Sequence, residues 1–317
     1  MCGFSLCVSK KKISLKEIRL MNKKISHRGP DKERFVNSNF IKEFKFKKKV
    51  NFLAGFRRLK IIDLSDRANQ PMLYDKKYLI IFNGEIYNYL ELKNILIKKK
   101  YKFKTKSDTE VILAAYDYWG KKCFNLFNGM WSLVIYDLKK NKLIACRDRY
   151  GVKPLYYRKI NDSLYFASEV KQLLIVKDKN IVNKNLLSDY LHHDLSSYNE
   201  QTFIEDIFQV RPGYYIEFDP TNFRFKNLRW YNFNKNIFRK KSTKLDIDNI
   251  LKNSIKLRLR SDVKLGISLS GGIDSSTIAS IVANLKKNSI KEIYTFSSRS
   301  KDKNDEYEYV KEFNKVY

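Results

Sequence analysis

Cys2, the second residue of the chain, is a strong nucleophile in an unusual place. Residues this close to a chain end are usually exposed and poorly ordered, so a thiol there is a liability unless it is used. If Met1 is removed, Cys2 carries both a thiol and a free α-amino group, which together can act as nucleophile and base. A cysteine can also follow Met1 by chance, so the assignment depends on partner groups elsewhere in the chain.

Two stretches of the sequence offer groups that could assist such a nucleophile. In "NGEIYN", Asn83 and Gly84 follow the apolar run "YLIIF", so we expect them at the end of a strand. A side-chain amide and a backbone N–H there can form an oxyanion hole. In "GFRRLKIID", Arg58 offers a guanidinium fork that suits a carboxylate. Taken singly, the Asn-Gly pair equally fits a hairpin turn and Arg58 equally fits surface charge.

Two acidic residues complete this inventory. In "SDTEVIL", Ser107 and Glu110 have the spacing of a capping box, which predicts a helix start and leaves Asp108 exposed in the first turn. Glu85 follows the Asn-Gly pair, although it could merely pair with a lysine, and Asp108 alone could be a helix cap. Together, a nucleophile with its own amine, an oxyanion hole, a carboxylate clamp and an ammonium acceptor fit glutamine.

A glycine-rich loop in "DVKLGISLSGGIDSS" points to a second chemistry. Residues 263–269 alternate as a strand, Gly271 and Gly272 let backbone amides approach an anion, and an amphipathic helix follows. The N-terminus of a helix favours phosphate through its unpaired N–H groups and dipole. No Gly-Lys-Ser/Thr closes the loop, so it is not a Walker loop, and we expect it to hold a leaving pyrophosphate. A plain Ser/Gly-rich turn is the alternative.

The net charge of +30 raises the question of a nucleic-acid partner. A nucleic-acid-binding protein concentrates Lys and Arg on one face, often with aromatic residues between them. Here the basic clusters are spread along the chain, at 10–12, 45–49, 98–100 and 239–241. We therefore interpret the charge as compositional drift that favours small anionic ligands, and predict no nucleic-acid partner.

The composition and the N-terminal sequence indicate where in the cell the protein is located. With 43% hydrophobic residues the chain can build cores, but no apolar run approaches the length of a membrane span. The N-terminus has its charges after its apolar stretch, unlike a signal peptide. The cysteines form no CxxC pair, which argues against disulfides or a zinc site: Cys2, Cys7, Cys123 and Cys146. We expect a cytoplasmic protein without a protein-bound metal or prosthetic group.

The order of elements predicts two domains. Many short strands with two or three helices predict an α+β layered domain over 1–230, and the polar stretch 231–244 reads as a linker. Residues 245–317 then show helix, strand, helix, strand and a last helix, the start of a parallel α/β sheet. Two strands cannot bury both faces of such a sheet, so we expect this second domain to be truncated.

The motifs also occur together and in one order. The N-terminal domain resembles the class II (N-terminal nucleophile) glutamine amidotransferases, on the motifs "MCGF", "HRGPD", "RLKIID", "QPM", "NGEIYN", "SDTEVIL", "FNGMWSLVIYD", "RDRYGVKPLYY", "FASEVKQLL" and "RPG". "SLSGGIDSS" resembles the ATP-pyrophosphatase (PP-loop) family. The pair of domains resembles the glutamine-hydrolysing asparagine synthetase family. This implies a four-layer αββα sandwich followed by an incomplete parallel-sheet domain.

The resemblance also implies roles. Cys2 would attack glutamine with its α-amine as base, Asn83 and Gly84 would stabilise the oxyanion, Arg58 would bind the α-carboxylate, and Asp108 with Glu85 would line the ammonium end. The ATP site would comprise Leu269, Ser270, Gly271, Gly272, Asp274, Ser275, Ser276 and Ser298. The implied substrates are glutamine, ATP with Mg²⁺, and aspartate. A homodimer is one assembly open to the chain, and the sequence does not give the oligomeric state.

One position departs from the family pattern, and several alternatives stay open. The family usually carries a histidine where Phe56 stands here, although Arg58 and the residues after it are intact. The segment that contacts the substrate adenylate would follow Tyr317, so aspartate recognition cannot be read. The acceptor could instead be another carboxylate, in surface-polysaccharide or peptide modification. Phosphoribosyl and sugar-phosphate amidotransferases lack the SGGxDSS loop, and a β-lactam-forming relative would lose Cys2. A basic nucleic-acid-binding protein and a non-catalytic interaction module are the rivals from other classes.

Overall fold

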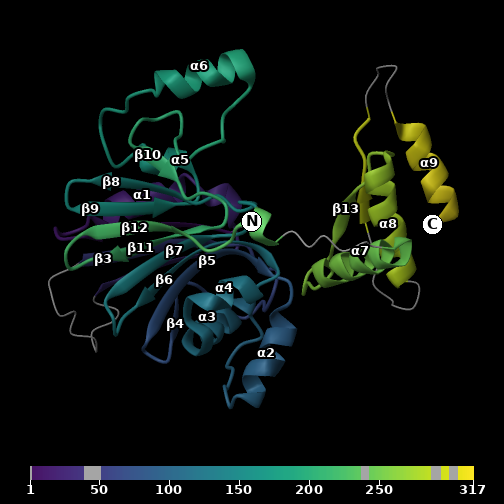
Figure 1. The fold of residues 1–317 in the computed structure, drawn as a ribbon, viewed down its shortest axis with the longest axis horizontal. Helices are drawn as coiled ribbons and strands as arrows, with labels where there is room; N and C mark the ends of the chain where they lie inside the picture. Colours follow the sequence, from purple (N-terminus) through teal and green to yellow (C-terminus); the bar gives the residue numbers. More distant parts are fainter. Residues whose placement is uncertain (1, 39–50, 237–242, 287–293, 300–305) are drawn as a thin grey trace. The chain divides into compact units, whose positions relative to one another are not determined.

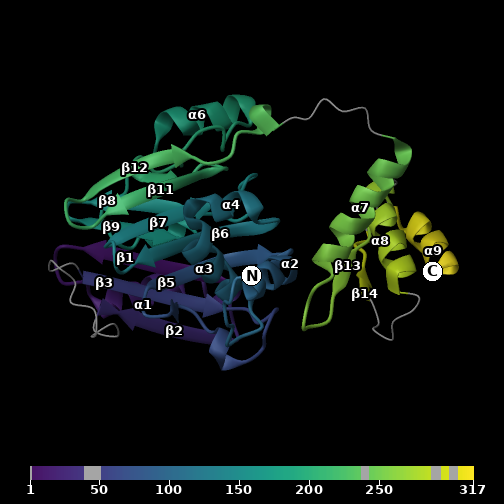
Figure 2. The ribbon, with the colours of Figure 1, turned by 60° about the horizontal axis from the view of Figure 1, so that its bottom comes forward.

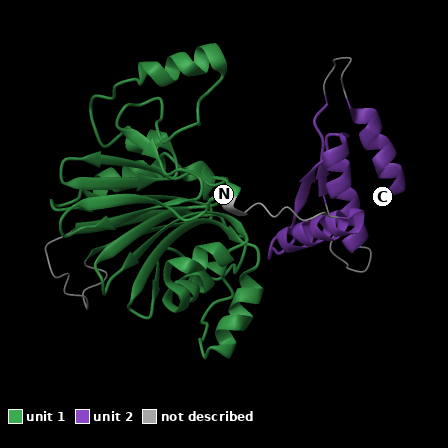
Figure 3. Ribbon diagram, viewed as in Figure 1, with its two compact units in different colours: residues 1–237 green, residues 238–317 purple. Residues whose placement is uncertain are grey.

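The computed structural model describes residues 2–38, 51–236, 243–286, 294–299 and 306–317. The chain divides into two compact units, residues 1–237 and 238–317 (Figure 3). Part of the predicted linker, 237–242, lies outside the described residues, as do Met1 and the basic clusters at 45–49 and 239–241.

The first unit is built on two six-stranded sheets in which neighbouring strands are antiparallel (Figure 1). The first sheet has the order β10 (Ile207–Gln209), β8 (Tyr156–Ile160), β9 (Ser163–Ala167), β1 (Gly3–Ser9), β3 (Asn51–Arg58) and β2 (Lys32–Asn37). The second has the order β12 (Arg224–Arg229), β11 (Tyr214–Asp219), β7 (Lys142–Arg147), β6 (Gly129–Asp137), β5 (Tyr78–Ile86) and β4 (Met72–Tyr74).

The two sheets pack face to face over a shared apolar core. Alternate residues of β1, Phe4, Leu6 and Val8, point into this core, as the period of two in the sequence predicts. Cys2 packs against its edge, so the start of β1 brings the thiol to the boundary between the sheets. Each large apolar side chain buried in this way stabilises the fold by about 1.5–3 kcal/mol.

Helices cover the outer faces of both sheets. Helices α1 (Leu15–Lys23) and α5 (Val170–Leu173) pack on the first sheet. Helix α3 (Asp108–Trp119), with α2 (Tyr89–Lys98) and α4 (Cys123–Leu126), covers the second. The predicted four-layer αββα sandwich is therefore confirmed.

The remaining helices of the first unit lie beside these layers. Helix α6 (Lys184–His193) stands apart from the sheets in both views (Figure 1 and Figure 2). Short 3-10 helices occur at η1 (Ser26–Arg28), η3 (Asp66–Ala68), η4 (Gly120–Lys122) and η5 (Phe233–Asn236). None of the described helices combines the length and the apolar character that crossing a membrane requires.

The second unit contains a short parallel sheet with helices. Strands β13 (Gly266–Ser268) and β14 (Tyr294–Phe296) pair in parallel, and helices α7 (Lys244–Arg258), α8 (Ile273–Lys286) and α9 (Tyr307–Val316) accompany them. Residues 263–269 were predicted as one strand, but only three of them pair. The sheet is incomplete, as predicted, and its apolar side chains form two small clusters.

Helix α7 shows the consequence of this small core. Its apolar residues Ile247, Ile250, Leu251 and Ile255 recur at helical spacing, but only Ile255 is buried, against Ile281 and Val282 of α8. The other three side chains are exposed. A two-strand sheet is too narrow to cover the length of a 15-residue helix.

Candidate active site

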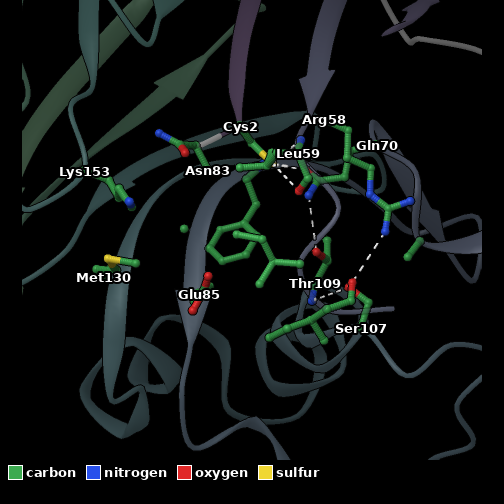
Figure 4. A pocket seen from close by; sticks show the side chains of 15 residues that line it. Cys2, Arg58, Leu59, Gln70, Asn83, Glu85, Ser107, Thr109, Met130 and Lys153 are labelled. Carbon is green, nitrogen blue, oxygen red and sulfur yellow. Dashed lines mark hydrogen bonds between the residues drawn. The ribbon is translucent and has the colours of Figure 1, made fainter. Parts of the chain in front are cut away.

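One cavity of the first unit collects most of the residues predicted for the glutamine site (Figure 4). Its volume is about 140 Å³, below the ~300–1,000 Å³ of sites for drug-sized ligands, so it suits a small metabolite. The lining residues are Cys2, Arg58, Leu59, Ile61, Ile62, Ala68, Gln70, Phe82, Asn83, Gly84, Glu85, Ser107, Thr109, Met130 and Lys153. The cavity thus joins Cys2, Arg58, Asn83, Gly84 and Glu85, and of the predicted glutamine-site residues only Asp108 is not in its lining.

The Cys2 thiol lies against the end of β3. Its Sγ accepts a hydrogen bond from Leu59 N at 3.3 Å and lies 3.5 Å from Leu59 O. Burial raises the pKa of the thiol, while the hydrogen bond with Leu59 and the charge of Arg58 oppose the shift. The thiol is therefore neutral at rest near pH 7, and a base must remove its proton before it attacks.

Asn83 and Gly84 lie inside a strand and not at its end, because β5 runs on to Ile86. The prediction placed them at a strand end since the apolar run stops at Phe82, but pairing with β6 continues past it. Asn83 is 1% exposed, and its Nδ2 has no hydrogen-bond partner among the described residues. Such a buried donor costs stability unless something binds it.

Gly84 is required by close packing between β5 and β6. A Cβ at this position would lie 2.1 Å from Met130 O and 2.7 Å from Trp131 Cα. No real side chain fits this space, so only glycine lets the two strands approach.

Arg58 holds the loop that follows it. Its Nη1 donates to Ser65 O at 2.8 Å and to Asn69 Oδ1 at 2.7 Å, and its Nη2 donates to Asp63 O and Ile62 O. The side chain is only 5% exposed, and burial lowers its pKa. The guanidinium thus brings a fixed positive charge to the cavity wall while it orders the 62–69 segment.

Sequence reasoning missed Lys153, which lines the cavity with its side chain only 5% exposed. Figure 4 shows Lys153 and Met130 on the side of the cavity opposite Gln70. Burial raises the pKa of Glu85 and lowers that of Lys153, while each charge opposes the shift of the other. The two groups therefore form a mutually stabilising pair of opposite charges in the cavity.

The loop carrying Lys153 is ordered by two residues of the motif "RDRYGVKPLYY". Asp148 Oδ2 accepts hydrogen bonds from Lys153 N at 3.0 Å and Trp131 N at 3.1 Å. Arg147 Nε donates to Lys153 O at 2.8 Å, and its Nη2 donates to Gly151 O at 2.8 Å. The sequence offered one signal for Lys153: it lies in the same motif as Arg147 and Asp148, a few residues after them.

Asp108 is buried, which corrects the prediction that it is exposed. Its Oδ2 accepts a hydrogen bond from Ile86 N at 3.0 Å, so its carboxyl group braces the end of β5. Burial raises its pKa to about 7, the Ile86 N–H opposes this, and the Glu85 charge adds to it. Asp108 is thus poised to exchange a proton near neutral pH beside the cavity.

The predicted capping box is also wrong in part. Ser107 does cap α3, because its Oγ accepts from Thr109 N at 3.1 Å. Glu110 instead turns back to Lys104 N and Thr105 N, at 2.9 and 2.7 Å. Those two N–H groups belong to the loop before the helix, so Glu110 fixes that loop and does not cap α3.

The glycine-rich loop of the second unit has the predicted strand, loop and helix order. Ser270 Oγ and Ser275 Oγ lie 3.0 Å apart, and Ser276 N donates to Gly272 O at 3.0 Å. Gly271 has φ +95, and a Cβ there would lie 2.7 Å from Glu306 O. The loop is therefore compact, exposed and glycine-dependent.

The other predicted residues of this second site differ in exposure. Leu269 is fully buried, and its carbonyl accepts a hydrogen bond from Ser297 Oγ at 2.6 Å. Asp274 is exposed in the first turn of α8, and Ser298 is exposed after β14. Because β13 and β14 are parallel, Ser298 and the loop leave the same edge of the sheet.

Several known proteins are similar to this chain in sequence. The chain is 36% identical over 288 residues to "Asparagine synthetase [glutamine-hydrolyzing] 1" of Bacillus subtilis, covering 89% of this chain and 44% of that protein. It is 35% identical over 332 residues to "Putative asparagine synthetase [glutamine-hydrolyzing] 2" of Methanocaldococcus jannaschii, covering 98% and 62%. The chain thus spans about half the length of the curated relatives it matches.

A solved structure with a similar fold is the glutamine phosphoribosylpyrophosphate amidotransferase of B. subtilis complexed with ADP and GMP. The two are 15% identical with a TM-score of 0.50, over 95% of this chain and 67% of the other, which supports the fold alone. Residues 246–316 match the family described as "Asparagine synthase". Residues 1–231 match the family described as "Glutamine amidotransferase domain", with the candidate nucleophile and oxyanion donors inside the matched range. The chain therefore belongs to the glutamine amidotransferase family.

Proposed function

We propose that the first unit hydrolyses glutamine with Cys2 as the nucleophile and releases ammonia. The observation that carries this proposal is the buried, unpartnered Nδ2 of Asn83 in the same cavity as the Cys2 thiol. A donor left without a partner in the resting site fits an oxyanion that exists only during the reaction. The matched family supports the same chemistry.

The reaction follows from the groups in the cavity. After Met1 is removed, the Cys2 α-amine takes the thiol proton, and the thiolate attacks the side-chain amide carbon of glutamine. Asn83 Nδ2 and the Gly84 N–H receive the oxyanion. The C–N bond then breaks, ammonia leaves with the proton from the amine, and a thioester remains. Water attacks the thioester, which releases glutamate and restores the thiol.

The charged groups of the cavity suit the two charged ends of an amino acid. Arg58 supplies the positive charge for the α-carboxylate. Glu85 and the nearby Asp108 supply negative charge for the α-ammonium, and Lys153 keeps the Glu85 pKa from rising further. Because ammonium binding favours the ionised carboxylate, glutamine would drive the Asp108 proton off.

We further propose that the second unit binds ATP and supports adenylation of a carboxylate. The loop between β13 and α8 suits the pyrophosphate end of ATP, through its backbone N–H groups and Ser270, Ser275 and Ser276 hydroxyls. Among the described residues no cluster of three metal-binding side chains occurs. Mg²⁺ bound with ATP needs only one or two carboxylates besides phosphates, and Asp274 fits that role.

The acceptor proposed is the β-carboxylate of aspartate. Ammonia would displace AMP from the aspartyl adenylate, so that the products are asparagine, glutamate, AMP and pyrophosphate. The two curated relatives bear the name asparagine synthetase, which supports this acceptor. Transfer to a different carboxylate is the alternative, and an assay with a panel of carboxylates plus ATP and glutamine separates the two. A homodimer and a cytoplasmic location stay predictions.

The proposal is tested by glutamate release from glutamine. We expect the purified chain to hydrolyse glutamine, and Cys2→Ala to lose the activity while keeping its melting temperature. Mass spectrometry of the intact chain checks that Met1 is absent. Activity that persists in Cys2→Ala, or in a chain that retains Met1, contradicts the proposed nucleophile and base.

A further inference from the structure

Two motifs of the first unit, "HRGPD" and "FASEVKQLL", take no part in the proposed chemistry but meet at the start of β1. Arg28 Nε donates to Cys2 O at 2.9 Å, and Arg28 Nη1 donates to Glu169 Oε1 at 2.9 Å. Arg28 is 8% exposed, so this connection is shielded from water. The backbone carbonyl of the candidate nucleophile is thus tied to a buried cation.

The residues just after Cys2 are hydrogen-bonded to the segment that carries the motif "FASEVKQLL". Phe4 N donates to Ser168 Oγ at 3.0 Å, and Phe4 O accepts from Ser168 N at 3.2 Å. Gln172 Nε2 donates to Phe4 O at 3.0 Å and to Ser5 Oγ at 2.8 Å. Both Ser168 and Gln172 are fully buried. We call Arg28, Ser168, Glu169 and Gln172 the β1 clamp.

The β1 clamp is itself held rigid. Glu169 N donates to Gln172 Oε1 at 2.8 Å. The Glu169 carboxylate also meets His27 Nε2 at 2.9 Å and Lys171 Nζ at 2.8 Å. Partial burial works against it, but the hydrogen bonds from Lys171, Arg28 and His27 lower the pKa of Glu169 to about 2. The Glu169 carboxylate is therefore ionised near neutral pH, and its ion pair with Arg28 is kept there.

Gly3 shows that the fit around Arg28 is close. A Cβ on Gly3 would lie 2.9 Å from Ile25 Cδ1 and 3.0 Å from Arg28 Cδ. A side chain at position 3 would therefore displace Arg28 or Ile25, and glycine leaves the Arg28 side chain the room it needs to reach Cys2 O.

We propose that Arg28, backed by Glu169, is a positioning residue that fixes the N-terminal nucleophile. This inference rests on the proposed role of Cys2. A terminal residue has a peptide bond on one side only, so its amine and thiol are placed by the peptide plane that follows it. Arg28 holds that plane through Cys2 O. The near-attack geometry of the thiol needs such restraint, because a misplacement of ~1 Å costs about 10²-fold in rate.

The test compares steady-state glutaminase kinetics of Arg28→Met and Arg28→Lys with Lys171→Met as the matched control. Lys171 also contacts the Glu169 carboxylate, but within the described part of the chain it makes no hydrogen bond to Cys2, and its side chain is 46% exposed. For Arg28→Met we expect kcat to fall about 10–100-fold with KM within about threefold, since a positioning defect acts on the reaction and not on binding. Arg28→Lys should recover part of kcat, and Lys171→Met should change it less than about threefold.

Glutamine binding is measured separately by calorimetry in the Cys2→Ala background. An unchanged Kd on adding Arg28→Met supports positioning, whereas a Kd raised more than about tenfold assigns Arg28 to substrate binding and overturns the inference. A kcat within threefold of the parent also overturns it. If Arg28→Met fails to fold, Glu169→Gln is used, for which we expect kcat about fivefold lower at constant KM. An unchanged kcat in that folded variant overturns the clamp.

The experiments distinguish a failure of the proposed glutaminase function from a failure of the positioning role of Arg28. If Cys2→Ala keeps glutaminase activity, the proposed function is wrong. If Cys2→Ala is inactive but Arg28→Met and Glu169→Gln are as active as the parent, only the role of the β1 clamp is wrong.

Discussion

Asn83→Ala separates a catalytic donor from a structural one more sharply than any other change in the cavity. The Asn83 Nδ2 group has no partner among the described residues and is buried beside the Cys2 thiol. If this group serves only the oxyanion, its removal should lower kcat and leave the free energy of unfolding nearly unchanged. If it served the fold, the reverse would hold.

The magnitudes follow from these surroundings. Loss of one oxyanion donor lowers kcat by about 10²–10³, or about 2.7–4 kcal/mol of transition-state stabilisation. An unsatisfied buried polar group costs the folded state about 1–3 kcal/mol, and its removal regains part of that. The small void left by the truncation works in the opposite direction. We therefore expect the free energy of unfolding to change by less than about 1–2 kcal/mol, which is within a few degrees of melting temperature.

The assay is glutamate release under saturating and limiting glutamine, with thermal unfolding on the same samples. Ser132→Ala is the matched control, because Ser132 pairs directly with Asn83 across β5 and β6. Its Oγ is also buried without a partner among the described residues, but it does not line the cavity. We expect Ser132→Ala to keep kcat within about threefold. A kcat for Asn83→Ala within threefold of the parent, or equal losses in both variants, refutes the oxyanion role.

Three further predictions concern charge and backbone packing. Burial raises the pKa of Asp108 to about 7, well above the ordinary value of 3.8 for an aspartate. The folded state therefore holds the proton to higher pH than the unfolded state does, and the contribution of Asp108 to stability falls as pH rises from about 4 to 7. Urea unfolding of the parent should show a decline in the free energy of unfolding on the order of 4 kcal/mol across this pH range, and Asp108→Asn should abolish it. Identical pH profiles for the parent and the variant would contradict the burial of Asp108. Gly84→Ala should destabilise the chain by about 3 kcal/mol or more, because its Cβ meets Met130 O, whereas Gly120→Ala, which has open space but φ +58, should lose only about 1 kcal/mol. Gly271→Ala should weaken ATP binding, measured by calorimetry, at least about tenfold, and equal affinity would exclude the glycine loop as the phosphate site.

Local patterns in the sequence were enough to predict the layers of the first unit and the glycine-rich loop of the second. The alternation of Phe4, Leu6 and Val8 predicts a strand, and the structure places these side chains between the two sheets, while the opposite face of the strand is buried as well. The order of strand, Gly271-Gly272 and amphipathic helix predicts the loop that the second unit contains. These features depend on residues within a few positions of one another, so a single sequence carries them.

Predictions of where a strand ends, or of whether a residue is buried, were less accurate. Asn83 and Gly84 were expected at a strand end, but β5 continues because β6 lies beside it. Asp108 was expected in solvent, since its position in the first turn of α3 says nothing of what covers that turn. The end of β5 lies against it, and burial raises its pKa to about 7 although the Ile86 N–H opposes the shift. Burial depends on neighbours that are distant in sequence.

The sequence by itself determined which chemical groups this protein has and the order of the elements that carry them: a thiol near the chain end, an amide donor next to a glycine, and a phosphate-type loop. Only the tertiary structure decided which of them share a cavity. It brought Lys153 beside Glu85 and tied Cys2 to Arg28, and through Arg28 to Glu169, across 141 residues of chain. The physical reason is that side-chain type is a local property, whereas distance, burial and charge pairing arise when the strands of two sheets pack together.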